Sequence, residues 1–274
     1  MCEYCTRHGS GKRWYENARN FSKELASTDY VIDFNDRYFV REPKPGSRVI
    51  LEYDSTRPID VEERSKVDTY YKKYLHHQVV THDEATSVLR LAGNLTEDHE
   101  KTIVALPCIC RYAVYGKDKS NACFGIAFSH EYTKRFPDYL GGNHQYLSVD
   151  EAQEHLENLI TNEDLVHAVS ALGVPYIGML CNCDMKVCSP YYQRVRLGID
   201  SPFHKGHSAA FIDASKCTQC GTCQEVCSFN VPIISDDESI MTINPESCFG
   251  CGVCVKHCPE DAIVLEPFER KLGF

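Results

Sequence analysis

Two cysteine runs near the C-terminus decide the fold of that part of the chain. The first reads Cys217-x-x-Cys220-x-x-Cys223-x-x-x-Cys227, and the second reads Cys248-x-x-Cys251-x-x-Cys254-x-x-x-Cys258-Pro259. Three cysteines on a tight loop can reach three irons of a cubane, whereas the fourth comes too late to join them and ligates the other cluster. The spacing therefore predicts two 4Fe–4S clusters with crossed ligands, one held by Cys217, Cys220, Cys223 and Cys258, the other by Cys248, Cys251, Cys254 and Cys227. The alternatives are a disulfide framework or zinc, which prefers separated Cys-x-x-Cys pairs to a triple run.

The segment from about residue 208 to 266 resembles the bacterial ferredoxins that carry two 4Fe–4S clusters. Beyond the cysteines, the resemblance includes Gly221 and Gly252, where the backbone must wrap closely around a cluster, and Ile263-Val264 at the place of a short closing strand. It implies a ferredoxin-like C-terminal domain that passes single electrons.

The length and charge of the chain limit what it can do. Its 274 residues suffice for two domains, which we expect at 1–205 and 206–274. The formal net charge of −10 argues against nucleic acid as a partner and favours docking to a basic patch on a redox partner protein. We expect no signal peptide and no membrane span, since no stretch approaches the roughly 20 apolar residues needed. So many cysteines indicate a reducing cytoplasm and, more weakly, an anaerobic host.

Residues 1–205 show both helical and strand patterns, so the expected fold class is α+β. Asp60, Thr81 and Ser148 are placed to cap helices, each with a glutamate three residues later. The pattern predicts a further helix from about 161 to 172. Strands are expected at 102–106 and 176–180, each followed directly by a Cys-x-Cys.

The remaining eight cysteines form three groups: Cys2 and Cys5; Cys108, Cys110 and Cys123; and Cys181, Cys183 and Cys188. Each of the last two groups follows the same order of features in the chain: an expected helix, an expected strand, a Cys-x-Cys and a later single cysteine. We interpret this as an internal duplication, with chance similarity as the alternative. A pseudo-twofold would then bring the two Cys-x-Cys pairs to comparable positions, with Cys2 and Cys5 as fourth ligands.

The order of these motifs also resembles a family of cysteine-rich, ferredoxin-type iron–sulfur proteins from anaerobic microbes. The resemblance rests on Pro107-Cys108-Ile109-Cys110-Arg111, Cys123-Phe124-Gly125, Leu165-Val166-His167, Cys181-Asn182-Cys183 and the segment 12–18. It implies a cysteine-rich domain ahead of the ferredoxin module. Members often carry further cysteines where this chain has Asp184 and Met185.

Three interpretations of the eight N-terminal cysteines stay open. They bind one or two additional iron–sulfur clusters, a structural zinc ion, or no metal as redox-active or buried thiols. Among the histidines, His76, His77, His82 and His167 are candidate ligands, although core or solvated histidines are commoner.

These observations lead to three functional hypotheses. The first is an electron-transfer protein or subunit that serves a partner, such as a flavoprotein or another oxidoreductase, since the chain has neither a dinucleotide fingerprint nor a phosphate loop of its own. The second is a self-contained reductase whose N-terminal Fe–S centre is catalytic and is fed by the ferredoxin module. The third is a redox-sensing regulator that reads DNA with the helices near Thr81 and Gly93, which the acidic charge disfavours. Whether the chain is an enzyme stays open at this point.

Overall fold

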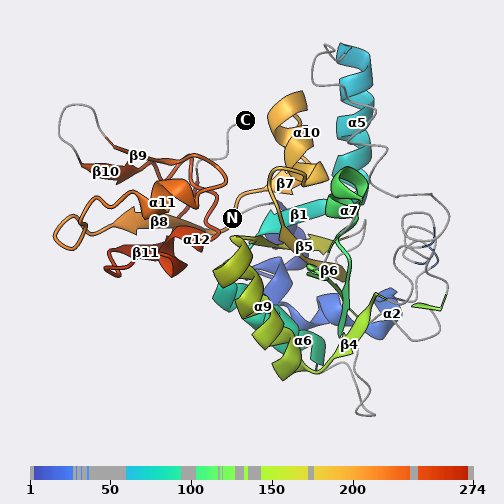
Figure 1. Cartoon of the computed structure of the whole chain (residues 1–274). Coiled ribbons are helices and arrows are strands. Elements are labelled where there is room, and N and C mark those ends of the chain that lie inside the picture. The colour runs from blue at the N-terminus through green and yellow to red at the C-terminus, as the bar shows by residue number, and fades with distance from the viewer. Residues whose placement is uncertain are drawn as a thin grey trace.

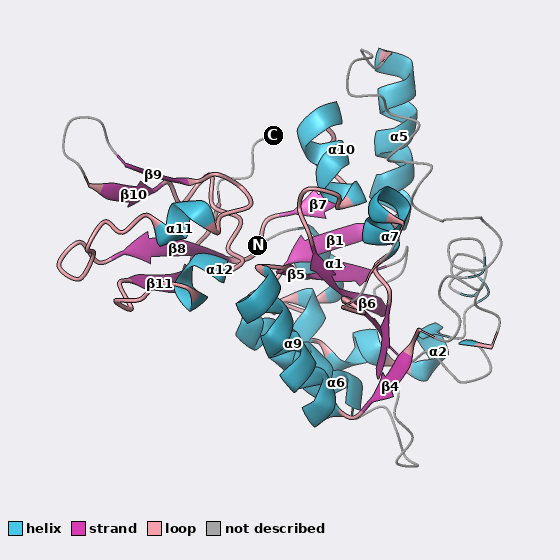
Figure 2. Ribbon diagram, viewed as in Figure 1, coloured by secondary structure: helices cyan, strands magenta, loops and turns pink. Residues whose placement is uncertain are grey.

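A computed structural model shows the architecture of the chain. It describes residues 3–26, 29, 32, 36, 60–93, 103–116, 118, 120–126, 133–134, 143–171, 176–234 and 240–270. The class is α+β: one large mixed sheet with helices on both faces lies beside a smaller module with two short two-stranded sheets (Figures 1 and 2).

The large sheet has seven described strands in the order β4-β2-β3-β6-β5-β1-β7. Neighbouring strands run antiparallel, except that β1 and β7 are parallel. The strands are β1 (His76–Val79), β2 (Ile103–Leu106), β3 (Cys123–Ile126), β4 (Gln145–Leu147), β5 (Val166–Ala171), β6 (Ile177–Cys183) and β7 (Phe203–His204).

Helices α6 (His82–Gly93) and α9 (Val149–Glu163) cover one face of this sheet. The capping predictions are confirmed for both. Thr81 accepts from the backbone of Glu84 while Glu84 accepts from that of Thr81, and Ser148 and Glu151 form the same box. Leu89, Leu156, Phe124 and Leu180 belong to the core between these helices and the sheet.

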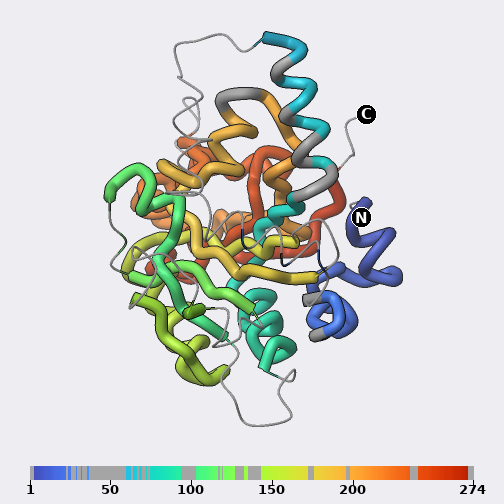
Figure 3. Tube along the Cα trace, turned by 90° about the vertical axis from the view of Figure 1, so that its right-hand side faces the viewer, coloured from blue at the N-terminus to red at the C-terminus, as the bar shows by residue number. Residues whose placement is uncertain are grey.

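Helices α7 (Ile109–Tyr115), α10 (Ser189–Leu197) and α5 (Val61–Tyr74) lie on the opposite side of the sheet (Figure 1). Asp60 caps α5 as expected, accepting from Glu62 N at 2.7 Å. The short elements α1 (Glu3–His8), η1 (Trp14–Glu16), η2 (Ala18–Phe21) and α2 (Lys23–Ala26) lie at the N-terminus, shown in blue in Figure 3.

The prediction of a helix from 161 to 172 is wrong. Helix α9 ends at Glu163, and Asp164 turns the chain with a φ of 53° before β5 begins. Every residue of β5 is buried, because the strand lies inside the sheet between β1 and β6. A fully buried strand has apolar residues on both faces, so its sequence cannot be told from a short buried helix by periodicity.

The internal duplication is not shown and stays a hypothesis. Helix α6 leads through one described strand, β2, to the first Cys-x-Cys, whereas α9 leads through two, β5 and β6, to the second.

The C-terminal module comprises β8 (Ser208–Ile212), α11 (Thr222–Glu225), β9 (Pro232–Ile234), β10 (Met241–Ile243), α12 (Val253–Lys256) and β11 (Ile263–Pro267). Strands β8 and β11 pair along their whole length, and β9 pairs with β10. The expected closing strand at Ile263 is therefore confirmed. This arrangement is ferredoxin-like, with each cysteine run wrapped around the start of a short helix.

The module packs tightly against the large sheet. Gly206, at the start of the module, lies so close to β1 that a Cβ there would be 2.9 Å from Val79 O. Lys256 of the module forms an ion pair with Glu157 at 2.5 Å, and His257 Nε2 contacts Asp164 Oδ1 at 2.9 Å. Among the described helices, none has both the length and the apolar character that a membrane crossing requires.

Candidate iron–sulfur sites

The two Cys-x-Cys segments meet at one end of the large sheet because of its topology. Strands β2 and β6 are both antiparallel to β3, which lies between them, so they run in the same direction. Their C-terminal ends therefore lie at the same edge, where Cys108 and Cys110 follow β2 and Cys181 and Cys183 end β6. Strand β3 starts at this edge with Cys123, directly opposite Cys181.

The Cys-x-Cys spacing also decides which face of the sheet the thiols occupy. Alternate residues of a strand share a face, so Cys181 and Cys183 point the same way. The register places Cys123 and His77 on that face too, since Cys123 pairs with Cys181 and His77 pairs with Ser170, two residues beyond the partner of Cys181. This is the face opposite α6 and α9.

Six thiols gather there, which we call the six-thiol site: Cys108, Cys110, Cys123, Cys181, Cys183 and Cys188. Direct contacts link them in a chain, from Cys110 through Cys108, Cys123, Cys181 and Cys183 to Cys188. All are buried or half-buried. Two helices start here, since Cys108 and Cys188 are the N-cap residues of α7 and α10.

Three of these thiols have a lowered pKa, while hydrogen bonds with their cysteine neighbours raise the pKa of Cys110, Cys123 and Cys183. Hydrogen bonds from Cys110 and Cys123 lower the pKa of Cys108, and those from Cys123 and Cys183 lower the pKa of Cys181. Burial raises the pKa of Cys188, but hydrogen bonds with Cys183 and His77 bring it to about 7. Since thiolates are the form that binds metal, this buried donor set fits an iron–sulfur centre or zinc.

Of the four candidate histidines, His77 is the one placed against thiols in the described structure. Its Nε2 lies 3.5 Å from Cys183 Sγ. His167 lies on the other face, hydrogen-bonded to Asn182 at 2.6 Å, and burial lowers its pKa to about 3, so it is a neutral core residue. His76 stacks between Tyr4 and His204, and His82 pairs with Glu157.

Cys5 is not brought to the six-thiol site. Its sulfur accepts from Trp14 N at 3.4 Å and lies 3.2 Å from His207 Nε2. His207 in turn contacts Gln78, which points to the face of β1 opposite His77. Cys5 is thus separated from the six thiols by the sheet, and Cys2 lies outside the described residues.

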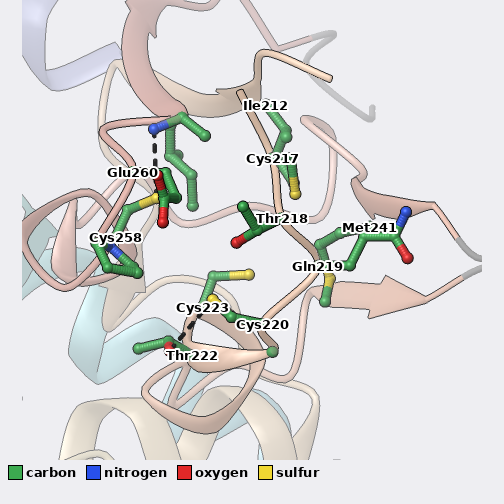
Figure 4. Close-up of a pocket in the computed structure, with 14 residues that line it drawn as sticks. Ile212, Cys217, Thr218, Gln219, Cys220, Thr222, Cys223, Met241, Cys258 and Glu260 are labelled. Atoms are coloured by element: carbon green, nitrogen blue, oxygen red, sulfur yellow. Dashed lines mark hydrogen bonds between the residues drawn. The ribbon is translucent and has the colours of Figure 1, made fainter. Parts of the chain in front are cut away.

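The C-terminal module contains two hollows of similar size. Figure 4 shows the first, where the sulfur atoms of Cys217, Cys220, Cys223 and Cys258 surround a common space. The second is lined by Cys227, Cys248, Cys251 and Cys254. Each hollow combines three cysteines of one run with the fourth of the other, the grouping that crossed ligation requires. The donor chemistry fits a 4Fe–4S cluster in each, and the ligand assignment itself stays a prediction.

Backbone amides also point at these sulfurs. Gly250 N and Ala210 N donate to Cys248 Sγ at 3.3 and 3.5 Å, and Ala262 N donates to Cys258 Sγ at 3.3 Å. Such bonds stabilise negative charge on thiolate sulfur and shift the potential of a cluster upwards.

The two hollows differ in their exposure. Cys220 in the first is exposed, and its hydrogen bond with Thr222 lowers its pKa. In the second, Cys248 and Cys254 are buried, and burial raises the pKa of Cys251 to about 12. We therefore call the first the outer hollow and the second the inner hollow.

An apolar group, the junction cluster, joins the inner hollow to the six-thiol site. Its buried members come from both parts of the chain: Val79, Ile160, Val166, Ala168, Cys183, Met185, Cys188, Phe203, Phe249 and Val253. Phe249 stacks on Phe229 at 4.1 Å between centroids and lies 5.8 Å from Phe203, with Tyr191 edge-on to all three rings. Sequence reasoning missed these aromatic residues, since nothing in their local spacing marks them.

Comparison with known proteins identifies the module. Residues 216–263 match the sequence model of the 4Fe-4S dicluster domain. The chain is 30% identical over 79 residues to Ferredoxin-3 of Nostoc sp., a match that covers 23% of this chain and 81% of the relative.

Two further relatives are similar over the same kind of short segment. The chain is 39% identical over 51 residues to one subunit of the Na(+)-translocating ferredoxin:NAD(+) oxidoreductase complex of Acetobacterium woodii, covering 19% of this chain and 15% of that protein. It is 35% identical over 65 residues to the beta subunit of adenylylsulfate reductase from Megalodesulfovibrio gigas, covering 21% and 38%. The chain thus spans well under half the length of these two proteins. By its C-terminal module, with two runs of four cysteines around two hollows, this chain belongs to the 4Fe-4S dicluster ferredoxin family.

Proposed function

We propose that this protein relays single electrons between a partner oxidoreductase and an additional iron–sulfur centre at its six-thiol site, by way of two 4Fe–4S clusters in the C-terminal module. Residues 1–205 and 206–274 are then its two functional units. The observation that carries the proposal is the junction cluster, in which Cys183 and Cys188 share one buried apolar group with Phe249 and the half-buried Cys251.

The difference in exposure sets the order of the relay. The outer cluster, at Cys217, Cys220, Cys223 and Cys258, faces solvent and exchanges electrons with the partner. The inner cluster, at Cys227, Cys248, Cys251 and Cys254, lies beside the junction and passes electrons to the six-thiol site. Buried clusters are shielded from water, which affects their potential, so the two clusters are expected to differ in potential.

The names of two relatives support a partner of this kind. One is a subunit of a ferredoxin:NAD(+) oxidoreductase complex and another is a subunit of adenylylsulfate reductase. We propose by analogy that this chain also works with an oxidoreductase, such as a flavoprotein, in the cytoplasm of an anaerobe. The acidic net charge of −10 favours a partner with a basic docking surface.

A self-contained reductase is the second candidate, and the size of the six-thiol site favours it. One cubane takes four cysteines, so six thiols and His77 exceed the needs of a single relay cluster. An additional metal with an open position would allow substrate to bind there. The regulator hypothesis is less well supported, because α6, its proposed DNA-reading helix, buries Ala85, Val88 and Leu89 in the core.

Iron and acid-labile sulfide counts on anaerobically purified protein test the proposal. In this proposal the two 4Fe–4S clusters of the dicluster module hold eight irons. We expect iron above eight in the wild type and a lower iron count in a Cys108→Ser/Cys181→Ser variant. A wild-type count of eight, after reconstitution with iron and sulfide, would refute the additional centre. Substrate-dependent turnover without any partner would favour the reductase.

A further inference from the structure

We infer that His77, Cys183 and Cys188 are the ligands of a separate metal centre in the N-terminal part, with His77 binding through Nε2. This inference rests on the proposed function for the presence of metal at the six-thiol site, and it adds a mixed imidazole–thiolate centre. The bound metal is a transition metal that accepts nitrogen and sulfur donors, either iron in a cluster or zinc.

The geometry of the three donors suits one metal. The two sulfurs and a ring nitrogen of His77 all lie within 4.8 Å of one another, and all three residues are buried. In a tetrahedral site with bonds of about 2.0–2.3 Å, donor atoms stand roughly 3.5–3.8 Å apart. The separation of 3.5 Å between His77 Nε2 and Cys183 Sγ is already at that value.

Ser170 holds the imidazole in the form that binds metal. The hydroxyl of Ser170 contacts both His77 Nδ1 and Cys181 Sγ, the latter at 3.8 Å. A metal-bound thiolate can only accept, so the one hydroxyl proton goes to Cys181 and the oxygen accepts from Nδ1–H. Nε2 is then left without a proton and faces Cys183. Histidine ligands usually donate their other N–H in this way.

The remaining four cysteines form a complete set of their own. Cys108 contacts Cys110 and Cys123, and Cys123 contacts Cys181, which gives four thiols in direct sequence. Four thiolates are what a cubane takes. Dividing the site between Cys181 and Cys183 therefore yields one all-cysteine set and one set of two cysteines and His77. The ring of Phe203 packs against His77 at 5.3 Å between centroids, so the mixed centre lies next to the junction cluster.

The test uses the full-length protein, purified anaerobically and loaded with iron, sulfide and zinc. His77→Ala should lose one metal centre, either the zinc or part of the iron above eight, while His77→Cys should retain it. Ser170→Ala should weaken binding of that metal by about 10–100-fold. The matched control is His155→Asn, since His155 is a half-buried histidine on the opposite face that bonds to Asn121 O at 3.2 Å.

The direct readout is the nitrogen ligand itself. Dithionite-reduced wild type should give a directly coordinated nitrogen signal in pulsed EPR that changes on 15N-histidine labelling. If the metal is zinc, X-ray absorption should show nitrogen at about 2.0–2.1 Å. Either signal should vanish in His77→Cys. Because it is measured on wild type, this readout decides even if His77→Ala does not fold.

The outcomes separate this inference from the proposed function. Iron above eight with neither nitrogen signal overturns the role of His77 and leaves the relay in place. Zinc with a nitrogen ligand and only eight irons supports the mixed centre and refutes the relay into the N-terminal part. No metal beyond eight irons overturns both.

Discussion

The junction cluster can be tested by replacing Phe203 with leucine. Phe203 is fully buried and lies 5.4 Å from Tyr191 and 5.8 Å from Phe249. Truncation to alanine would cost about 3–5 kcal/mol, a large part of a typical stability of about 5–15 kcal/mol. Leucine keeps most of the volume and should cost less than about 1.5 kcal/mol, so Phe203→Leu should fold and retain its metal.

The control for this change is Phe124→Leu. Phe124 is equally buried, but it lies on the other face of the sheet against His155. We expect similar losses in the free energy of unfolding for both variants, measured by denaturant titration. Only Phe203→Leu should slow the reduction of the N-terminal centre.

Anaerobic stopped-flow absorbance, with a reductant that enters at the module, separates the two events. Bleaching of the module clusters should proceed at the wild-type rate in both variants, and the slower phase from the N-terminal centre should lengthen in Phe203→Leu. Equal slow phases in the two variants would show that Phe203 contributes packing alone, and the proposed route through the junction would have to be abandoned.

Three further changes test other parts of the molecule. Cys227→Ala should damage the cluster of the second cysteine run, and loss confined to the cluster of the first run, seen by EPR, would contradict crossed ligation. Glu157→Gln should slightly destabilise the contact between α9 and α12: the hydrogen bond with Lys256 lowers the pKa of Glu157, so its stabilisation is present at neutral pH and lost as the pH falls through the folded pKa. Because the pair is partly exposed, the effect should be under about 1 kcal/mol, and a Tm difference from wild type that persists unchanged at about pH 3 would argue against it. The acidic loop residues Asp236, Asp237 and Glu238 lie outside the described residues. Neutralising all three should slow reduction by a basic partner at low ionic strength but not at high, since exposed charges are screened beyond about 10 Å at ~0.1 M salt. An unchanged rate at low salt would remove this loop from the docking surface.

Local sequence was sufficient where a structure depends on neighbours in the chain. The capping boxes at Thr81 and Ser148 formed as predicted, because both partners lie within one helical turn. The two cysteine runs likewise predicted a ferredoxin-like module, since a run of three cysteines at this spacing wraps around one cluster whatever precedes it.

Local sequence misled where the surroundings of a segment decide its structure. Residues 166–171 contain apolar side chains that suit a buried helix or a buried strand equally. The position between β1 and β6 made them a strand, because its backbone groups pair with both neighbours. Cys5 is a second case, because the sequence around it does not indicate which face of the sheet this cysteine will reach.

The sequence by itself therefore determined the chemistry of the chain: its thiol donors, their Cys-x-Cys and triple-run spacings, and the two-cluster module. Only the tertiary structure decided which donors meet. The common direction of β2 and β6 brings six cysteines together, and pairing of β1 with β5 adds His77 from about a hundred residues away in sequence. The physical reason is that strand order and register place side chains by long-range backbone hydrogen bonds, which no local pattern encodes.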